Sequence, residues 1–355
     1  MAVWVASVAR MFEVVERTAI DQDVWNAAVE RSPQAWLWHL HDLPGALATW
    51  ETRRDLSFAL FDKGIIVALV PLQAIILKKV GPFVIRRLES FGGIAGPEDS
   101  VSEGTRTRAV EEIRKIALEE KAVYVDFVLS PLAPSYRGPG GPRVNPLLEI
   151  GCENTLSQTW LVDLSEDEDI IWKGISKRTR EYIRRAEATG VVVELGGDER
   201  SLDSYYELHL QTYRRTGVVP HPIEYFKTIW ERFVPEGHSR ILLAVIDGKV
   251  EAGLNVAVYK GAGCYWTGAS SPAGQTFRAN HFLQWQAMRW LKSSGARWYE
   301  TGEAHFGTAA NKYRGISNFK QKFGGMLVPF YKGRLPLDSS ARSRLLDTYF
   351  ALKGR

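Results

Sequence analysis

The residues best suited to chemistry in this chain lie within residues 299–325. Two carboxylates, Glu300 and Glu303, flank a glycine where a buried strand is expected to emerge. Further along, Phe319 and Lys320 place a lysine beside an aromatic ring, and a glycine pair then lets backbone pass close to another group. A lysine ammonium at short range can stabilise negative charge that develops during a reaction. The alternative interpretation is a solvated lysine on a surface loop, because lysines are mostly exposed.

A polar, glycine-containing stretch at 305–314 lies between the carboxylates and the lysine. We expect it to form a loop over a site. Within it, His305 is a candidate for taking a proton near neutral pH, and Tyr313 is a candidate substrate contact. An ordinary loop histidine is the competing interpretation of His305.

A second candidate surface is a basic helix predicted over 176–189. Phosphate groups of a nucleic acid are bound by Lys and Arg side chains, so RNA contact is one interpretation of this helix. A solvated helix face is the other, and two glutamates within the helix temper its charge. The residues concerned are Lys177, Arg178, Arg180 and Arg184.

Composition narrows the class of protein. The chain has 355 residues, a formal charge of +4 and a pI near 8.9, which permits an anionic partner without requiring one. Cys152 and Cys264 form neither a metal-type spacing nor a disulfide framework, which fits a reducing cytosol. No signal peptide, membrane span, metal-ligand cluster, Ser-His-Asp order or P-loop is recognised in the sequence. We therefore expect a cytoplasmic protein without a metal.

The predicted elements repeat once along the chain. Each half contains helices, a hairpin with a Gly turn, a strand, an amphipathic helix and another strand. The turns are Lys63-Gly64 and Asp247-Gly248, and the helices cover 105–121 and 280–293, the second capped by Asn280. A proline- and glycine-rich stretch at 131–146 is the best candidate linker. The order favours a duplicated α/β unit.

The second half resembles the FemABX-type aminoacyltransferases and the wider acyltransferases that share their tandem GNAT-like fold. The resemblance covers about 155–333 and depends on several motifs in the family's order. Apart from the overall layout, the first half adds only Val67-Ala68-Leu69-Val70-Pro71-Leu72 to it. The motifs are KRTREYIRRAEATG at 177–190, LHLQTYRRTGVVPHPIEYF at 208–226, YWTGAS at 265–270, FLQW at 282–285 and FKQKFGG at 319–325.

This resemblance implies an α/β (α+β) fold of two tandem GNAT-like domains, each a mixed twisted sheet flanked by helices. We expect domain 1 at 1–150, domain 2 with the active site at 151–335, and a tail at 336–355 packed on domain 1 or in the cleft. The family's activity implies transfer of an aminoacyl group from aminoacyl-tRNA to an amine. That acceptor is a peptidoglycan precursor or a small-molecule amine such as an antibiotic, and no cofactor is implied.

The resemblance also assigns roles to particular residues. It places Lys320 and Phe319 in the catalytic centre, with Lys320 carrying the oxyanion. Arg215 and Tyr265 match positions that hold the acceptor's phosphates or sugar, although a solvated helix end and a core tyrosine are their respective alternatives. Glu300 and Glu303 stand where typical members have Asp and Gly, which puts substrate identity in doubt. A paired-carboxylate role is one interpretation, with one member structural.

Two alternatives to a tRNA donor remain open. One is an N-acyltransferase that uses acyl-CoA or a carrier-protein thioester. GNAT enzymes bind the CoA pyrophosphate with small residues before a helix. Here Arg278 and Asn280 stand at those positions within 275–280, and they are expected to crowd a pyrophosphate. The other alternative is a catalytically silent GNAT-like binding module in envelope or polysaccharide biosynthesis.

Overall fold

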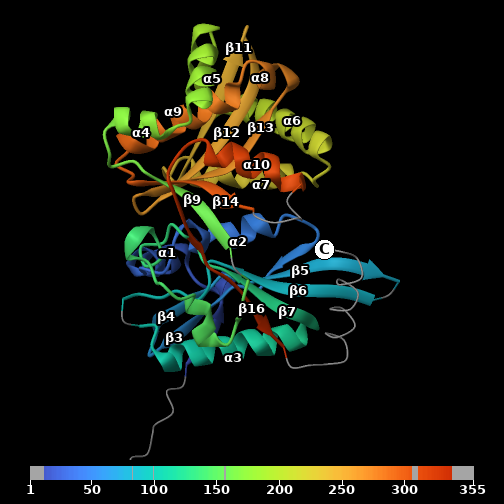
Figure 1. Cartoon of the computed structure of the whole chain (residues 1–355). Helices are drawn as coiled ribbons and strands as arrows, with labels where there is room; N and C mark the ends of the chain where they lie inside the picture. Colours follow the sequence, from blue (N-terminus) through green and yellow to red (C-terminus); the bar gives the residue numbers. More distant parts are fainter. Residues whose placement is uncertain (1–11, 82, 99, 156, 306–310, 338–355) are drawn as a thin grey trace, which may run out of the picture.

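A computed structural model of the chain describes residues 12–337 except 82, 99, 156 and 306–310. Figure 1 shows two α/β units, one above the other, each with helices packed on a sheet. The first half of the chain forms the lower unit and the second half the upper one. The last described strand returns to the lower unit, and the tail predicted for 336–355 lies outside the described residues from 338 onward.

The first unit holds two sheets, ordered β1-β3-β4 and β2-β5-β6-β7-β16-β8. The helix α3 packs on β7 and β4, and α1 also packs on β4. The strands are β1 (Glu13–Glu16), β2 (Arg53–Asp55), β3 (Phe58–Asp62), β4 (Ile65–Val70), β5 (Gln73–Val80), β6 (Phe83–Phe91), β7 (Ala122–Val128), β8 (Glu153–Asn154) and β16 (Lys332–Pro336). The helices are α1 (Gln22–Arg31), α2 (Asp42–Leu47) and α3 (Glu103–Glu119).

The second unit is built on one sheet, ordered β10-β11-β12-β13-β14-β9-β15. Helix α9 packs on β11, β12 and β13, and α6 packs on β12 and β13. The strands are β9 (Ser157–Asp163), β10 (Val192–Gly196), β11 (Ser239–Ile246), β12 (Lys249–Tyr259), β13 (Ala262–Ser270), β14 (Trp298–Ala304) and β15 (Met326–Phe330). The helices are α4 (Glu168–Gly174), α5 (Lys177–Ala188), α6 (Glu199–Thr216), α7 (Ile223–Thr228), α8 (Pro272–Thr276), α9 (Ala279–Ser293) and α10 (Asn311–Gln321).

Both predicted hairpins are confirmed. Lys63 and Gly64 join β3 to β4 with φ of 50° and 80°, and Asp247 and Gly248 join β11 to β12 with φ of 50° and 75°. Two successive residues with positive φ match the right-handed twist of the strands they connect. In each half a parallel strand pair then follows, joined by a helix: β6–α3–β7 and β13–α9–β14.

The cap predicted for α9 was wrong by two residues. Arg278, not Asn280, precedes the helix, and it adopts the left-handed conformation with φ 60° and ψ 27°. Its side chain makes no capping hydrogen bond to the first turn of α9. The start of this helix therefore lacks the side-chain acceptor that a Ser, Thr, Asp or Asn at that place would supply.

The two units are joined by buried contacts. Lys260, in the turn between β12 and β13, donates its Nζ to the carbonyls of Val29 and Ser32, both at 2.6 Å, at the end of α1. Trp36 donates its indole N–H to the Tyr259 carbonyl at 2.9 Å. These bonds hold the turn of the second unit against the first.

The stretch at 131–146, predicted as a linker, is packed rather than free. Leu132 and Ala133 are fully buried in the apolar cluster that spans both units. Arg137 donates to the Lys260 carbonyl at 2.5 Å. Proline and glycine content predicted a linker here, and the apolar residues within the stretch pack it into the cluster that spans both units.

A buried histidine in the first unit makes stability depend on pH. His39 is fully buried, its Nδ1 accepts from the Trp36 N–H, and its Nε2 lies 3.3 Å from the Gly93 carbonyl. Burial lowers the pKa of His39 from 6.5 to about 4. The unfolded chain therefore binds this proton first, so the contribution of His39 to stability is constant above pH 6.5 and is lost as pH decreases toward 4. The difference corresponds to about 3 kcal/mol.

Denaturant unfolding at pH 7 and pH 4 measures this effect. In His39→Gln, which cannot take up the proton, the loss between the two pH values should be smaller than in the wild type by most of that amount. Equal losses in the two proteins would show that His39 does not contribute.

Candidate active site

The site begins where two parallel strands separate. β13 and β14 pair in parallel only from Ala262↔Trp298 to Cys264↔Glu300. Beyond this point β13 stays with β12 as far as Ser270, and β14 stays with β9 as far as Ala304. The corresponding pair in the first unit, β6 and β7, remains in register up to Phe91↔Val128. Only the second of these two strand pairs opens at its carboxyl end.

Lys320 reaches β14 at the point where the strands part. A bulge lies between Glu300 and Gly302, and Gly302 has a φ of +111°. A Cβ added to Gly302 would lie 2.4 Å from the Lys320 Nζ, so the ammonium occupies the space that the missing side chain leaves. The Nζ donates to the Glu303 carbonyl oxygen at 3.3 Å. Lys320 is thus a half-buried residue near the end of α10 and not a solvated lysine on a loop.

The two carboxylates of β14 lie in different surroundings. Glu303 pairs with the Lys332 Nζ at 2.7 Å and also accepts from the Ser157 hydroxyl. Glu300 is 9% exposed and accepts one hydrogen bond, from the Thr159 hydroxyl to Oε1 at 2.6 Å. Because Lys332 belongs to β16 of the first unit, the Glu303 pair also ties the site to the neighbouring sheet.

Burial and charge together shift the protonation of these groups. Burial lowers the pKa of Lys320, and the carboxylates of Glu300 and Glu303 oppose this change. Burial raises the pKa of Glu300, with Thr159 and Lys320 opposing. Burial acts in the same direction on Glu303, but Lys332 outweighs it, so the Glu303 pKa is lowered. The result is an ammonium that loses its proton more readily than usual beside a carboxylate that accepts one more readily.

The other residues predicted for the centre have different environments. Phe319 packs against the rings of His281 and Phe323, with both ring centroids 5.0 Å away. It therefore belongs to the core beneath α10. His305 follows β14, and its backbone N–H donates to the Ser317 hydroxyl at 3.2 Å. Burial lowers the His305 pKa, which Glu303 opposes. Tyr313 lies in α10, but its side chain is outside the described part of the structure.

Tyr265 directly follows the last residue of β13 that pairs with β14, whereas Arg215, in α6, contacts the far end of β13 at Ser270. The Arg215 guanidinium donates twice to the Ser270 carbonyl, at 3.2 Å each, and it faces the side-chain amide of Gln275. The rest of this arginine is exposed. Tyr265 is half-buried, and its hydroxyl lies against Gly268, where an added Cβ would be 2.3 Å away. Tyr265 therefore lies beside the point where the strands part, and Arg215 lies at the other end of β13.

The basic helix α5 divides into structural and exposed residues. Arg180 donates to the carbonyls of Trp172, Lys173 and Ile175, at 3.3, 2.8 and 3.0 Å, and so caps the end of α4. Lys177, Arg178 and Arg184 are exposed. Of the four basic residues proposed for RNA, three therefore remain available at the surface.

Sequence reasoning missed two partners of this helix. The Arg278 guanidinium lies 4.6 Å from the centroid of the Tyr182 ring, and Arg178 lies 5.5 Å from the same ring. Tyr182 in turn contacts His281 at 5.2 Å, and His281 contacts Phe319. A chain of aromatic contacts thus leads from two exposed arginines to the residue before Lys320. The i,i+4 spacing of Arg178 and Tyr182 was a visible signal, but the approach of Arg278 from the turn before α9 was not.

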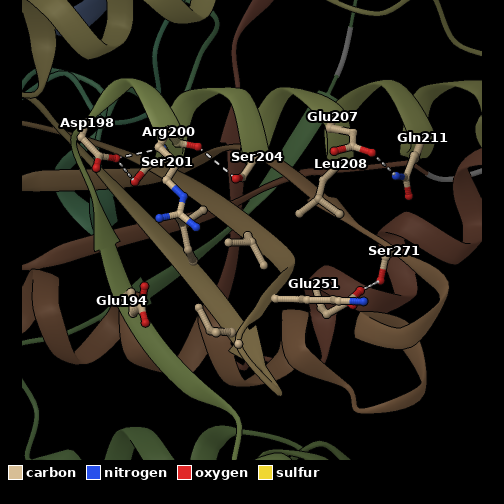
Figure 2. A pocket seen from close by; sticks show the side chains of 15 residues that line it. Glu194, Asp198, Arg200, Ser201, Ser204, Glu207, Leu208, Gln211, Glu251 and Ser271 are labelled. Carbon is tan, nitrogen blue, oxygen red and sulfur yellow. Dashed lines mark hydrogen bonds between the residues drawn. The ribbon is translucent and has the colours of Figure 1, made fainter.

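A separate groove lies between α6 and the strands β10–β12 (Figure 2). It has a volume of about 650 Å³, and polar side chains line most of it. Its carboxylates are used locally: Asp198 accepts from Ser201, and Glu251 accepts from Ser271. No residue predicted for the active site is among those that line this groove, so we do not assign the chemistry to it.

Residues 174–320 match the sequence profile of the family described as "Acetyltransferase (GNAT) domain". This span contains the parting strands, both carboxylates and Lys320. The second half of the chain is therefore similar in sequence to GNAT acetyltransferase domains. No curated protein matches the chain.

Several solved structures are similar in fold to almost the whole chain, not only to its second half. FemX superimposes with a TM-score of 0.67 at 16% identity, over 96% of this chain and 99% of FemX. The C-terminal domain of a putative lysylphosphatidylglycerol synthetase from Agrobacterium fabrum gives 0.57 at 15% identity, over 94% and 96%. A tandem GNAT protein from the clavulanic acid biosynthesis pathway gives 0.57 at 13% identity, over 93% and 100%. The predicted fold of two tandem GNAT-like units is therefore confirmed.

No helix among the described residues has the length and apolar character that crossing a membrane requires. No group of three or more His, Cys, Asp or Glu side chains among them is arranged to hold a metal ion.

Proposed function

We propose that the protein is an acyltransferase that forms an amide by moving an aminoacyl group from aminoacyl-tRNA to an amine. The observation that carries the proposal is the Lys320 ammonium, half-buried where β13 and β14 part, with a single hydrogen bond to the described residues. An ammonium has three donors, so two remain for a substrate. Lys320 then holds the carbonyl oxygen of the donor ester as it becomes an oxyanion.

The remaining site residues position the reactants. Glu303, fixed by Lys332 and Ser157, holds the strand segment whose carbonyl orients Lys320. Phe319 supports the same helix from the core side. Tyr265 of β13 and Arg215 of α6, which reaches the end of β13, are proposed to contact the acceptor, a small-molecule or peptidoglycan-precursor amine. His305, which follows β14, and Tyr313, in α10, are further proposed contacts of the reactants.

The exposed arginines support RNA as the carrier of the donor. Arg178 and Arg278 both contact the Tyr182 ring. Lys177 and Arg184 are further exposed basic residues of α5. Arginine binds phosphate with paired N–H groups, and an aromatic ring offers a stacking surface to a base. The aromatic contacts through His281 place this surface beside the helix that carries Lys320.

Removing the two arginines tests this assignment. In Arg178→Ala/Arg278→Ala, the KM for aminoacyl-tRNA should rise roughly tenfold, and the dependence of log KM on log salt should lose about one unit of slope per arginine. The kcat should change little, because neither side chain reaches the reacting atoms. Arg200→Ala, in the groove of Figure 2, is the matched control and should alter neither quantity. An unchanged KM and an unchanged salt slope in the double variant would contradict RNA binding at this surface.

A second candidate, transfer from an acyl-CoA or carrier thioester, is favoured by the start of α9. The helix lacks a side-chain cap there, and the Arg278 guanidinium is held on Tyr182. An uncapped helix start beside an arginine suits a pyrophosphate as well as an RNA phosphate. The part of the steric objection that concerned Arg278 is thereby weakened, whereas the part that concerned Asn280 still stands.

The donor is tested by incubating the purified protein with labelled aminoacyl-tRNA, or with acyl-CoA, and a panel of amines. Amide formed from aminoacyl-tRNA alone supports the first function, and amide formed from acyl-CoA alone supports the second. If the folded protein consumes no donor, the non-catalytic binding module is the better interpretation.

A further inference from the structure

The proposed reaction also needs a group that takes a proton from the attacking amine, and Glu300 has the contacts of such a group. Its Oε1 accepts from Thr159, whereas its Oε2 has no hydrogen bond to the described residues. Glu303, by contrast, has both a hydroxyl and an ammonium as partners. Of the two carboxylates flanking Gly302, Glu303 is therefore engaged in holding the fold and Glu300 retains a free acceptor.

Glu300 and Lys320 lie near each other, as a proton acceptor for the amine and a cation for the oxyanion would have to. Glu300 is the last residue of β14 that pairs with β13, and Lys320 occupies the space beside Gly302, two residues on. The carboxylate and the ammonium influence each other's charge, yet they form no ion pair within 4.0 Å among the described contacts. A reacting carbonyl can thus meet Lys320 while the attacking nitrogen meets Glu300.

Other groups that face Glu300 are poorly suited to this task. The Cys264 thiol, opposite Glu300 on β13, is buried, and its pKa is raised well above the ordinary value, so it remains protonated. Lys320 and Lys332 are cations, and Glu303 is held by Lys332. The neighbouring Tyr299 is fully buried, and its hydroxyl donates to Gln284.

We propose that Glu300 is the catalytic base of the transfer, accepting on Oε2 the proton that the acceptor amine loses as it attacks. This inference rests on the proposed function. The nitrogen lone pair forms the new N–C bond while the carbonyl π electrons move to oxygen, where Lys320 holds the negative charge. The N–H proton passes to Glu300. The oxyanion then collapses, the C–O bond to the ribose breaks, and Glu300 returns the proton to the ribose oxygen. One ester and one amine become one amide and one alcohol.

The Glu300→Gln variant tests the proposal, because it keeps the shape and the Thr159 contact but cannot accept a proton. We expect kcat to fall roughly 100-fold with a donor KM within about threefold of the wild type. Semicarbazide serves as acceptor in a pH series, since its nucleophilic nitrogen stays unprotonated well into the acid range. The wild type should lose activity toward acid as Glu300 is protonated, and the Gln variant should lack this decline. Glu300→Asp should restore the decline at reduced kcat.

The possible outcomes separate the two proposals. If the wild type forms amide and Glu300→Gln retains its kcat within threefold, or keeps the acid decline, Glu300 is not the base and the proposed function stands. A lower unfolding midpoint with the acid decline preserved shows a structural role and also overturns the inference. If the wild type transfers from no donor, both proposals fall. Glu194→Gln, outside the site in the groove of Figure 2, controls for loss of a carboxylate and should match the wild type.

Discussion

Replacing Lys320 by Met is expected to lower kcat by roughly 10²–10³-fold, because one donor to a developing oxyanion contributes about this much. Met has nearly the same length and can occupy the same space beside Gly302, so the fold should persist. The charge is lost from a position where burial has already lowered the pKa of the ammonium. Single-turnover transfer from labelled aminoacyl-tRNA measures the chemical step directly, and unfolding by denaturant verifies the fold.

The Lys320 prediction has a matched control two residues along the chain. Lys322 is exposed, so Lys322→Met removes an equal charge without altering the space beside Gly302, and it should leave kcat unchanged. The wild type should also lose activity toward alkaline pH earlier than an ordinary lysine allows, since the cation disappears at a lowered pKa. A Lys320→Met variant with wild-type kcat would contradict the oxyanion role. The separation of β13 and β14 would then be the remaining argument for the position of the site.

Local chemistry made much of this fold predictable. The dipeptides Lys63-Gly64 and Asp247-Gly248 identify hairpins, because a tight turn needs positive φ at adjacent positions. The amphipathic pattern within α3 likewise marks a helix that buries one face. These signals depend on residues a few positions apart, so the sequence alone exposes them. Their order along the chain then predicts the two corresponding α/β units.

The site was less predictable because long-range contacts build it. Sequence motifs singled out Lys320, Glu300 and Glu303, but not which carboxylate is engaged. That distinction depends on Lys332, which comes from a strand of the other unit's sheet and pairs with Glu303. The passage of Lys320 beside Gly302 depends on a bulge and a φ of +111° that no local pattern announces.

The same limit explains the basic surface. Arg180 and Arg184 look alike in sequence, yet Arg180 caps α4 while Arg184 is exposed over Trp172. Arg278, which sequence reasoning treated as an obstacle to a pyrophosphate, instead joins Arg178 on Tyr182. Charge counts identify a basic helix, but only the neighbouring elements decide which charges are available to a ligand.

Replacing Gly302 by Ala is expected to impair the site without deleting any functional group. The new Cβ would lie 2.4 Å from the Lys320 Nζ and 2.8 Å from its Cε, so the flexible end of the lysine must move away. A φ of +111° is also unfavourable for Ala and should cost about 1–3 kcal/mol of stability. We expect kcat to fall roughly 10–100-fold, since an ammonium displaced by about an ångström no longer meets the oxyanion.

Gly315→Ala provides the comparison, because Gly315 lies in the same helix as Lys320 and an added Cβ there meets nothing within 4 Å. That variant should gain about 0.5–1 kcal/mol, as Ala is the better helix former, and keep full activity. Measuring kcat and unfolding free energy for both variants separates the displaced ammonium from general loss of stability. If Gly302→Ala loses stability but retains kcat, the position of the Lys320 ammonium beside Gly302 is not required for the reaction. If Gly302→Ala lowers kcat about as much as Lys320→Met does, then the ammonium reaches the reacting carbonyl only because residue 302 has no side chain.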